Sequence, residues 1–375
     1  MSLQTILDEA VAAGAAPGVS AAVLQPDGSV SLAASGRVGA VEEAAVSADT
    51  LFWIASCTKA VTSVAALKLV EAGVLDLDAP VGERAPGLAS PQVLEGFDAD
   101  GTPRLRPARE PITLRRLLAH TSGLAYDFFS AELGRCLAAQ GVTMAGGGGE
   151  PGHLPLLFEP GGGWQYGIGI DWVGRLIETA SGEPLDEHFE RAIFAPLGMR
   201  ETRFFPDPEA PRCRQARKAG PGEFAPIESP PASARSFWMG GGGLYSTPRD
   251  YLKFLSVIAG GGAPLLGATM FQEMMRSQTG EREAGGLKAA NPALSNDFAP
   301  LAGRRPRHGL AGLVNLDGVP GGRSAGSLAW AGLANCYYWA DPARGAAGVL
   351  MAQVFPFADP QILAAFDAVE QWAYR

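Results

Sequence analysis

Strand patterns near both ends of the chain enclose a stretch of helical patterns, and this order limits the possible folds more than any other feature. Residues 18–24 and 29–36 carry small and β-branched side chains on either side of the turn sequence Pro26-Asp27-Gly28, which is typical of a β-hairpin. Three further strand patterns lie near the other end, at 327–333, 335–340 and 346–354. We therefore predict an α+β fold whose antiparallel sheet is built from both chain ends.

Helices are predicted beside and between these two groups of strands. Thr58 to Ala72 is rich in Ala, Val, Leu and Lys and is followed by Gly73, and residues 361–374 place apolar side chains at helical spacing. In the middle of the chain, Gly-rich and Pro-rich loops separate helical stretches at 114–119, 171–180 and 185–194. We expect a sheet domain flanked by helices and a mostly helical inserted domain, formed by residues 1–80 with 231–375 and by residues 81–230.

Composition excludes several classes of partner. The 375 residues are 47% hydrophobic and 18% charged, which allows a substantial core. The formal net charge of −9 opposes a phosphate-binding surface, so nucleic acid is not an expected partner. No apolar run approaches the roughly 20 residues of a membrane helix, and Met1 to Ala16 lacks the features of a signal peptide. We expect a cytoplasmic protein with no membrane partner.

The cysteines and histidines do not form a recognisable metal or disulfide pattern. Each type occurs four times, without C-x-x-C, H-x-H or H-E-x-x-H spacing. We therefore expect reduced thiols and no metal site.

Ser56-Cys57-Thr58-Lys59 lies at the start of the first long predicted helix. Positions i and i+3 share one face of a helix, which brings the amine of Lys59 within reach of the Ser56 hydroxyl. A helix N-terminus also supplies unpaired N–H groups and positive potential, which favour a developing oxyanion. An isolated motif of this kind more often only caps a helix, so its meaning depends on the rest of the chain.

The surrounding motifs supply that context. They are Phe52 to Ala55, His120-Thr121-Ser122-Gly123-Leu124, Tyr166 after a glycine-rich loop, Gly240 to Thr247, and Trp330-Ala331-Gly332. Together with the Ser56 motif, their order resembles the serine β-lactamases, the D-alanyl carboxypeptidases and, most closely, the family VIII carboxylesterases. The resemblance covers almost the whole chain. It implies a serine hydrolase with its active site between the two predicted domains and with no cofactor.

The resemblance also assigns roles to individual residues. Ser56 would be the acylated nucleophile, Lys59 its proton acceptor, and Tyr166 the group that carries a proton to or from the leaving alcohol. The backbone N–H groups of Ser56 and Leu333 would form the oxyanion hole. Trp330-Ala331-Gly332 would occupy the position of the family's Lys-Thr-Gly motif. The further candidates for an apolar acyl pocket are Tyr126, Phe128, Phe129 and Trp238.

A second serine competes for the role of nucleophile. Gly322-Arg323-Ser324-Ala325-Gly326 matches the G-x-S-x-G elbow of α/β-hydrolases. That elbow needs a buried strand before the serine and a helix after it, whereas Ser324 follows turn residues and precedes a predicted strand. The α/β-hydrolase triad also places its histidine after the serine, and no histidine follows His308. We therefore prefer Ser56.

Two departures from the family pattern bear on the substrate. Members that cleave lactams or peptides place an asparagine two residues after the tyrosine, where this chain has Ile168, and a lysine or histidine where it has Trp330. Without these groups the site suits a neutral ester better than a penicillin or a D-alanyl peptide. We expect a carboxylesterase that hydrolyses small-molecule, short-chain esters. The alternatives are acyl transfer on the same fold, a β-lactamase or D-amino-acid peptidase, and a non-catalytic binding protein.

Overall fold

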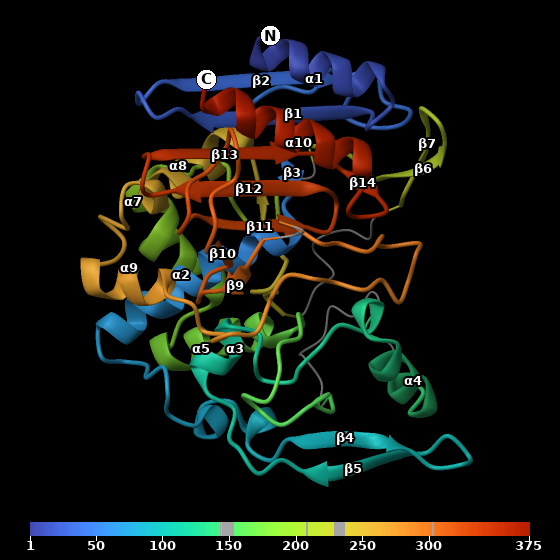
Figure 1. The fold of residues 1–375 in the computed structure, drawn as a ribbon, viewed down its shortest axis with the longest axis vertical. Coiled ribbons are helices and arrows are strands. Elements are labelled where there is room, and N and C mark those ends of the chain that lie inside the picture. Colours follow the sequence, from blue (N-terminus) through green and yellow to red (C-terminus); the bar gives the residue numbers. More distant parts are fainter. Residues whose placement is uncertain (143, 145–153, 208, 229–236, 302–303) are drawn as a thin grey trace.

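A seven-stranded antiparallel sheet forms the centre of the computed structural model, which describes residues 1–142, 144, 154–207, 209–228, 237–301 and 304–375 (Figure 1). The strand order is β2-β1-β13-β12-β11-β10-β9. The strands are β1 (Gly18–Leu24), β2 (Val30–Gly36), β9 (Pro306–His308), β10 (Leu313–Asn315), β11 (Leu328–Gly332), β12 (Cys336–Asp341) and β13 (Ala346–Met351).

The two chain ends meet at β1 and β13. The hairpin pairs Gly18 with Gly36 and Leu24 with Val30, as its turn sequence predicts, and Ser20 of β1 pairs with Met351 of β13. The predicted α+β fold with an antiparallel sheet from both ends is therefore confirmed. The sheet is extended by β9 and β10, which the sequence does not predict because three-residue strands show too little alternation.

Helices cover both faces of the sheet. The rings of Tyr337 and Trp339 on β12 lie 5.3 and 5.5 Å from the ring of Phe366. The ring of Tyr338, between them, lies 5.6 Å from that of Tyr251. Because successive side chains of a strand point to opposite faces, the helices that carry Phe366 and Tyr251, α10 and α8, lie on opposite sides of the sheet. The helices of this part are α1 (Leu3–Ala12), α2 (Thr58–Glu71), α8 (Pro248–Ala259), α9 (Ala268–Met275) and α10 (Pro360–Ala373).

The middle of the chain combines helices with short strands. Its helices are α3 (Leu114–Leu118), α4 (Ala131–Ala139), α5 (Gly169–Ser181), α6 (Leu185–Phe189) and α7 (Ala195–Leu197), with a π-helical turn at Glu190–Phe194. Its strands are β4 (Gln92–Phe97), β5 (Pro103–Pro107), β6 (Ala216–Gly220) and β7 (Glu223–Pro226), while β3 (Phe52–Trp53) pairs with β8 (Tyr245–Ser246) and β14 (Val354–Phe355) pairs with β6. The predicted domain boundary at residues 230 and 231 lies outside the described residues.

The helix α2 is central because it is buried on every side. All ten residues from Thr58 to Leu67 are buried, and the helix packs against α5. A helix without a polar face needs neighbours all round it. This position holds the start of α2, and with it Ser56 and Lys59, at the junction of the sheet and the helical part of the chain.

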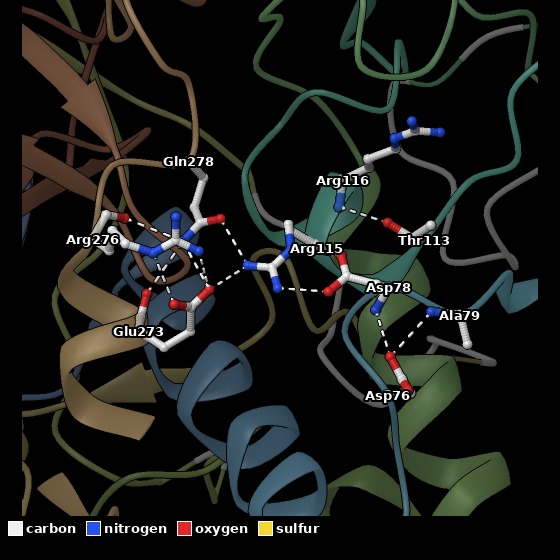
Figure 2. A network of polar contacts seen from close by, with 9 residues as sticks. All are labelled: Asp76, Asp78, Ala79, Thr113, Arg115, Arg116, Glu273, Arg276 and Gln278. Atoms are coloured by element: carbon white, nitrogen blue, oxygen red, sulfur yellow. Dashed lines mark hydrogen bonds and ion pairs between the residues drawn. The ribbon is translucent and has the colours of Figure 1, made fainter. Parts of the chain in front are cut away.

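An ion-pair network joins α3, α9 and the loop after α2 (Figure 2). The Arg115 guanidinium donates to both carboxylate oxygens of Asp78, at 2.6 and 2.7 Å, and also contacts Glu273 and the Gln278 side chain. Hydrogen bonds from Arg276 and Arg115 lower the pKa of Glu273 to about 2. The network therefore connects α3, the helix before His120, to α9 and to the loop after α2.

We predict that Arg115→Met lowers the free energy of unfolding by about 1–2 kcal/mol, because Asp78 and Glu273 both lose a charged donor. Arg37→Met is the control, since Arg37 makes one exposed ion pair with Glu43, and its loss is expected to cost less than about 0.5 kcal/mol.

The effect of Arg115→Met also depends on pH. The folded-state pKa of Glu273 lies below its ordinary value of 4.5. The contribution of its ion pairs to the free energy of unfolding is therefore complete above pH 4.5 and is lost as the pH falls toward 2. Urea unfolding at several pH values measures both effects, and equal losses for the two variants would contradict the assignment.

Candidate active site

Ser56 lies in a 3-10 turn, Ala55–Cys57, that leads directly into α2. The sequence predicts this serine at the helix N-terminus, and the structure places it two residues before Thr58, the first residue of α2. Ala55 has a φ of +45°, a conformation that L-amino acids rarely adopt. The turn is held by the Tyr251 hydroxyl, which donates to the Cys57 carbonyl at 2.9 Å, and by the Ile54 N–H, which donates to the Leu244 carbonyl. The nucleophile candidate is thus presented by a strained, anchored turn.

The amine of Lys59 is buried and surrounded by oxygen atoms. Its Nζ lies 3.1 Å from Ser56 Oγ, 3.1 Å from the Tyr126 hydroxyl and 2.6 Å from the Gly241 carbonyl. Lys59 is only 3% exposed. A neutral amine has two N–H donors and one lone pair, so it can donate to Gly241 and Tyr126 while accepting the Ser56 proton. The geometry therefore allows Lys59 to act as a base toward Ser56.

Asp171 holds two of the groups that contact Lys59. Its Oδ1 accepts the Gly241 N–H at 2.9 Å, and its Oδ2 accepts the Tyr126 hydroxyl at 3.5 Å. A Cβ on Gly241 would lie 2.5 Å from Asp171 Oδ2, so this close approach requires glycine. Burial raises the pKa of Asp171, and burial together with the Asp171 charge raises the pKa of Tyr126. Sequence reasoning missed Asp171, although an aspartate among the apolar residues of a predicted helix was a usable signal.

Tyr166 and Trp330 form a second polar pair beside Ser56. Trp330 Nε1 donates to the Tyr166 hydroxyl at 3.2 Å, and the two rings lie 4.9 Å apart. Lys59 Nζ lies 4.8 Å from the centre of the Tyr166 ring. Because the Tyr166 oxygen accepts from Trp330, its own proton can be donated to an oxygen of a bound molecule. In the described part of the chain, no hydrogen bond joins Tyr166 directly to Ser56 or Lys59.

A cavity of about 130 Å³ opens at Ser56. It is lined by the predicted site residues Ser56, Tyr126, Phe128, Phe129, Tyr166, Trp330, Ala331 and Leu333, and by residues without a predicted role there, Trp53, Ala55, Met239, Gly241, Gly242, Leu287 and Phe357. The walls are mainly aromatic and aliphatic. Aromatic residues such as Phe357 come from loops whose course in space the sequence does not reveal.

Two predicted substrate-binding residues lie elsewhere. Trp238 packs its ring against Phe204 and Phe205, at 5.2 and 4.9 Å, and lines a separate depression beside α6. Its place in the cavity is taken by the next residue, Met239. Gly332 is not among the residues that line the cavity, and a Cβ there would lie 2.3 Å from the Ile54 carbonyl oxygen. Its lack of a side chain instead lets β11 approach the segment before Ser56.

His120 supports the site without contacting Ser56. Its Nδ1 accepts the Gly167 N–H at 3.4 Å, and its ring lies 4.7 Å from that of Tyr166. Burial lowers the pKa of His120 well below its ordinary value and lowers that of the neighbouring His308 to about 4. Both rings are therefore neutral at pH 7 and pack as aromatic groups behind Tyr166.

Ser324 lies in the loop between β10 and β11. Its N–H donates to Asp341 Oδ2 at 2.8 Å, and the chain continues into a strand rather than a helix.

Within the described residues, no group of three His, Cys, Asp or Glu side chains is arranged to hold a metal ion, and no helix is long and apolar enough to cross a membrane. His153 lies outside the described residues.

Comparison with known sequences identifies relatives over most of the chain. The profile of the beta-lactamase family matches residues 3–370. The chain is 32% identical to the lovastatin esterase of Penicillium rubens, over 84% of this chain and 82% of that protein. It is 35% identical to monacolin J acid methylbutanoyltransferase of Aspergillus terreus, over 83% of this chain and 79% of that protein.

Solved structures show the same fold. Unliganded simvastatin synthase from Aspergillus terreus superposes with a TM-score of 0.83 at 27% identity, covering 98% of this chain and 96% of that chain. EstCE1, a hydrolase with promiscuous acyltransferase activity, superposes with a TM-score of 0.77 at 23% identity over 98% and 97% of the two chains, which shows likeness of fold alone. The resemblance found in the motifs is thereby confirmed: the chain belongs to the beta-lactamase family and is a serine hydrolase.

Proposed function

We propose that this enzyme is a carboxylesterase of the family VIII type that hydrolyses short-chain, neutral esters through an acyl-enzyme on Ser56. The observation that carries the proposal is the contact of Lys59 Nζ with Ser56 Oγ at 3.1 Å, at the opening of an apolar cavity. Relatives named as an esterase and as an acyltransferase support acyl chemistry at this site.

In the acylation step, Lys59 accepts the Ser56 proton while Ser56 Oγ attacks the ester carbonyl carbon. The backbone N–H groups of Ser56 and Leu333 stabilise the oxyanion. When the C–O bond breaks, the leaving alkoxide takes the proton of Tyr166, and the Trp330 N–H stabilises the tyrosinate that remains.

In deacylation, water attacks the acyl carbon and gives a proton to Tyr166, while Lys59 returns its proton to Ser56. The carboxylic acid leaves, and both bases regain their starting states. The cycle needs no cofactor, because the two proton carriers and the nucleophile are side chains of this chain.

The cavity also supports the choice of substrate. Its volume of about 130 Å³ suits a short acyl group, and its lining contains no arginine, lysine or histidine to pair with a substrate carboxylate. Desolvating an anion without such a partner costs at least about 1–3 kcal/mol. A neutral ester avoids this cost.

Acyl transfer is the second candidate function. A curated relative at 35% identity is named a methylbutanoyltransferase, which favours an alcohol acceptor in place of water. The two activities share the acyl-enzyme and differ in what attacks it. Adding an alcohol during hydrolysis of a p-nitrophenyl ester separates them: a new ester as the main product indicates a transferase, and acid as the main product indicates an esterase.

The first prediction concerns the nucleophile. Ser56→Ala is expected to abolish ester hydrolysis, and Lys59→Ala to lower kcat by about a thousandfold or more, because the nucleophile or its base is lost. Ser324→Ala is the matched control and is expected to keep most of the activity and to react with a fluorophosphonate at Ser56. Peptide mapping of the fluorophosphonate adduct of the wild-type enzyme to Ser324 would overturn the assignment.

The second prediction concerns Asp171 as a positioning residue. Asp171→Asn is expected to lower kcat roughly tenfold or more, since the neutral amide no longer orients Tyr126 as an acceptor for Lys59. The variant also lacks the Asp171 carboxyl, whose pKa is raised by burial, so the acid limb of the kcat/KM profile is expected to shift to lower pH. A variant with reduced activity and an unmoved pH profile would indicate a purely structural role.

The third prediction concerns the substrate. On one preparation, kcat/KM for p-nitrophenyl acetate or butyrate is expected to exceed that for benzylpenicillin by at least about a thousandfold, because the site offers no partner for the penicillin carboxylate. Comparable constants for the ester and the penicillin would show that Ile168 and Trp330 do not set the preference.

A further inference from the structure

A second, larger cavity of about 450 Å³ lies between α10 and strands β11 and β12 of the sheet. Its walls include Phe298, Ala329, Trp330, Tyr337, Leu363 and Phe366, together with the Arg323 side chain. Trp330 is shared with the cavity at Ser56, while Ser56, Lys59 and Tyr166 do not line the larger cavity. The two spaces are therefore distinct neighbours that meet at Trp330.

Small side chains on the sheet create this space. Ala329 pairs with Trp339, so it faces the same side as the Trp339 ring, which packs on Phe366 of α10. A larger residue at 329 would fill the gap between the helix and the strand. Phe298 closes the side toward Ser56, with its ring 6.4 Å from Trp330 and 4.9 Å from Phe357, a residue of the active-site cavity.

Arg323 brings unsatisfied hydrogen-bond donors to this apolar space. The residue is 6% exposed, and neither its Nε nor its Nη1 has a hydrogen-bond partner within the described part of the chain. Its only ion pair there is with Glu370, whose Oε2 lies 3.6 Å from Nη1. The other oxygen of Glu370 accepts the Arg323 backbone N–H at 2.9 Å. Buried donors without partners are uncommon and costly, and an acceptor supplied by a ligand removes that cost.

The local charge selects the kind of acceptor. Arg304 and Asp367 also line the cavity, so together with the Arg323–Glu370 pair its two basic and two acidic side chains carry no net charge. A lining without net charge gives a carboxylate no net attraction to offset the loss of its hydration, whereas a carbonyl oxygen accepts the Arg323 N–H groups at a smaller desolvation cost. We propose that this cavity is a second binding site, for a neutral, largely apolar molecule that places a carbonyl oxygen against Arg323.

The test uses 2-heptanone, a neutral ketone that an esterase cannot hydrolyse. Crystals of the whole enzyme soaked with it are expected to show the ketone between Phe366 and Ala329, with its oxygen about 3 Å from Arg323 Nε or Nη1. A cavity that stays empty or holds only water, or a ketone found only beside Ser56, would overturn the proposal.

Titration in solution provides an independent measure. Ala329→Leu fills the cavity from the sheet, and Ala329 does not line the cavity at Ser56, so we expect it to weaken 2-heptanone binding about tenfold or more while ester turnover stays within about twofold. Arg323→Met is expected to weaken 2-heptanone binding by a similar factor if the variant folds. If it does not fold, the result for Ala329→Leu decides whether the proposed site exists.

Heptanoate, titrated in parallel, tests the charge argument. It is expected to bind more weakly than the ketone. Tighter binding of heptanoate, or unchanged ketone binding by Ala329→Leu, would contradict the assignment.

Discussion

The environment of the Lys59 amine is the constraint on which the active site depends. A buried amine must have partners for its N–H groups, and this one finds them in the Ser56 hydroxyl, the Tyr126 hydroxyl and the Gly241 carbonyl. These oxygens come from three separate segments of the chain. The position of one nitrogen atom therefore fixes the relative placement of the start of α2, the loop that follows α3 and the glycine-rich segment before β8.

Asp171 extends the same constraint to the helical part of the molecule. It comes from α5, and it binds both the hydroxyl of Tyr126 and the N–H of Gly241. Since α5 packs against α2, the carboxylate and the amine are brought together by two helices that are buried against each other. The hydrogen bond between Trp330 and Tyr166 joins the loop before α5 to strand β11. Sheet and helical segments thus each contribute polar groups to one small volume.

The sequence predicted those parts of the fold whose patterns are local. The hairpin at Pro26-Asp27-Gly28 has a turn signature, and the strands from Ser327 onward have a long enough apolar pattern to be recognised. The prediction failed to include β9 and β10, which are too short for a pattern. It also failed for Trp238, because neighbouring residues of an irregular loop point in different directions and only the folded chain shows that Met239 faces the cavity.

In the active site, too, the sequence could predict local contacts but not contacts between distant segments. The spacing of Ser56 and Lys59 is local, so the sequence could predict their approach. The contacts of Lys59 with Tyr126 and Gly241 join residues that are far apart along the chain, and no periodicity in one sequence indicates such pairs. Asp171 was overlooked for a related reason, since its partners become visible only when α5 and the glycine-rich segment are placed side by side.

If Ser56 carries the acyl group during turnover, the acyl-enzyme can be trapped and the position of the acyl group on the chain determined. Rapid acid quenching during the hydrolysis of p-nitrophenyl butyrate, followed by peptide mass spectrometry, locates any covalent acyl group. We expect one butyryl group on the peptide that contains Ser56, formed before the steady state and lost when the substrate is consumed. A butyryl group on another side chain, or turnover without any acylated peptide in the wild-type enzyme and in a variant with slowed deacylation, would contradict it.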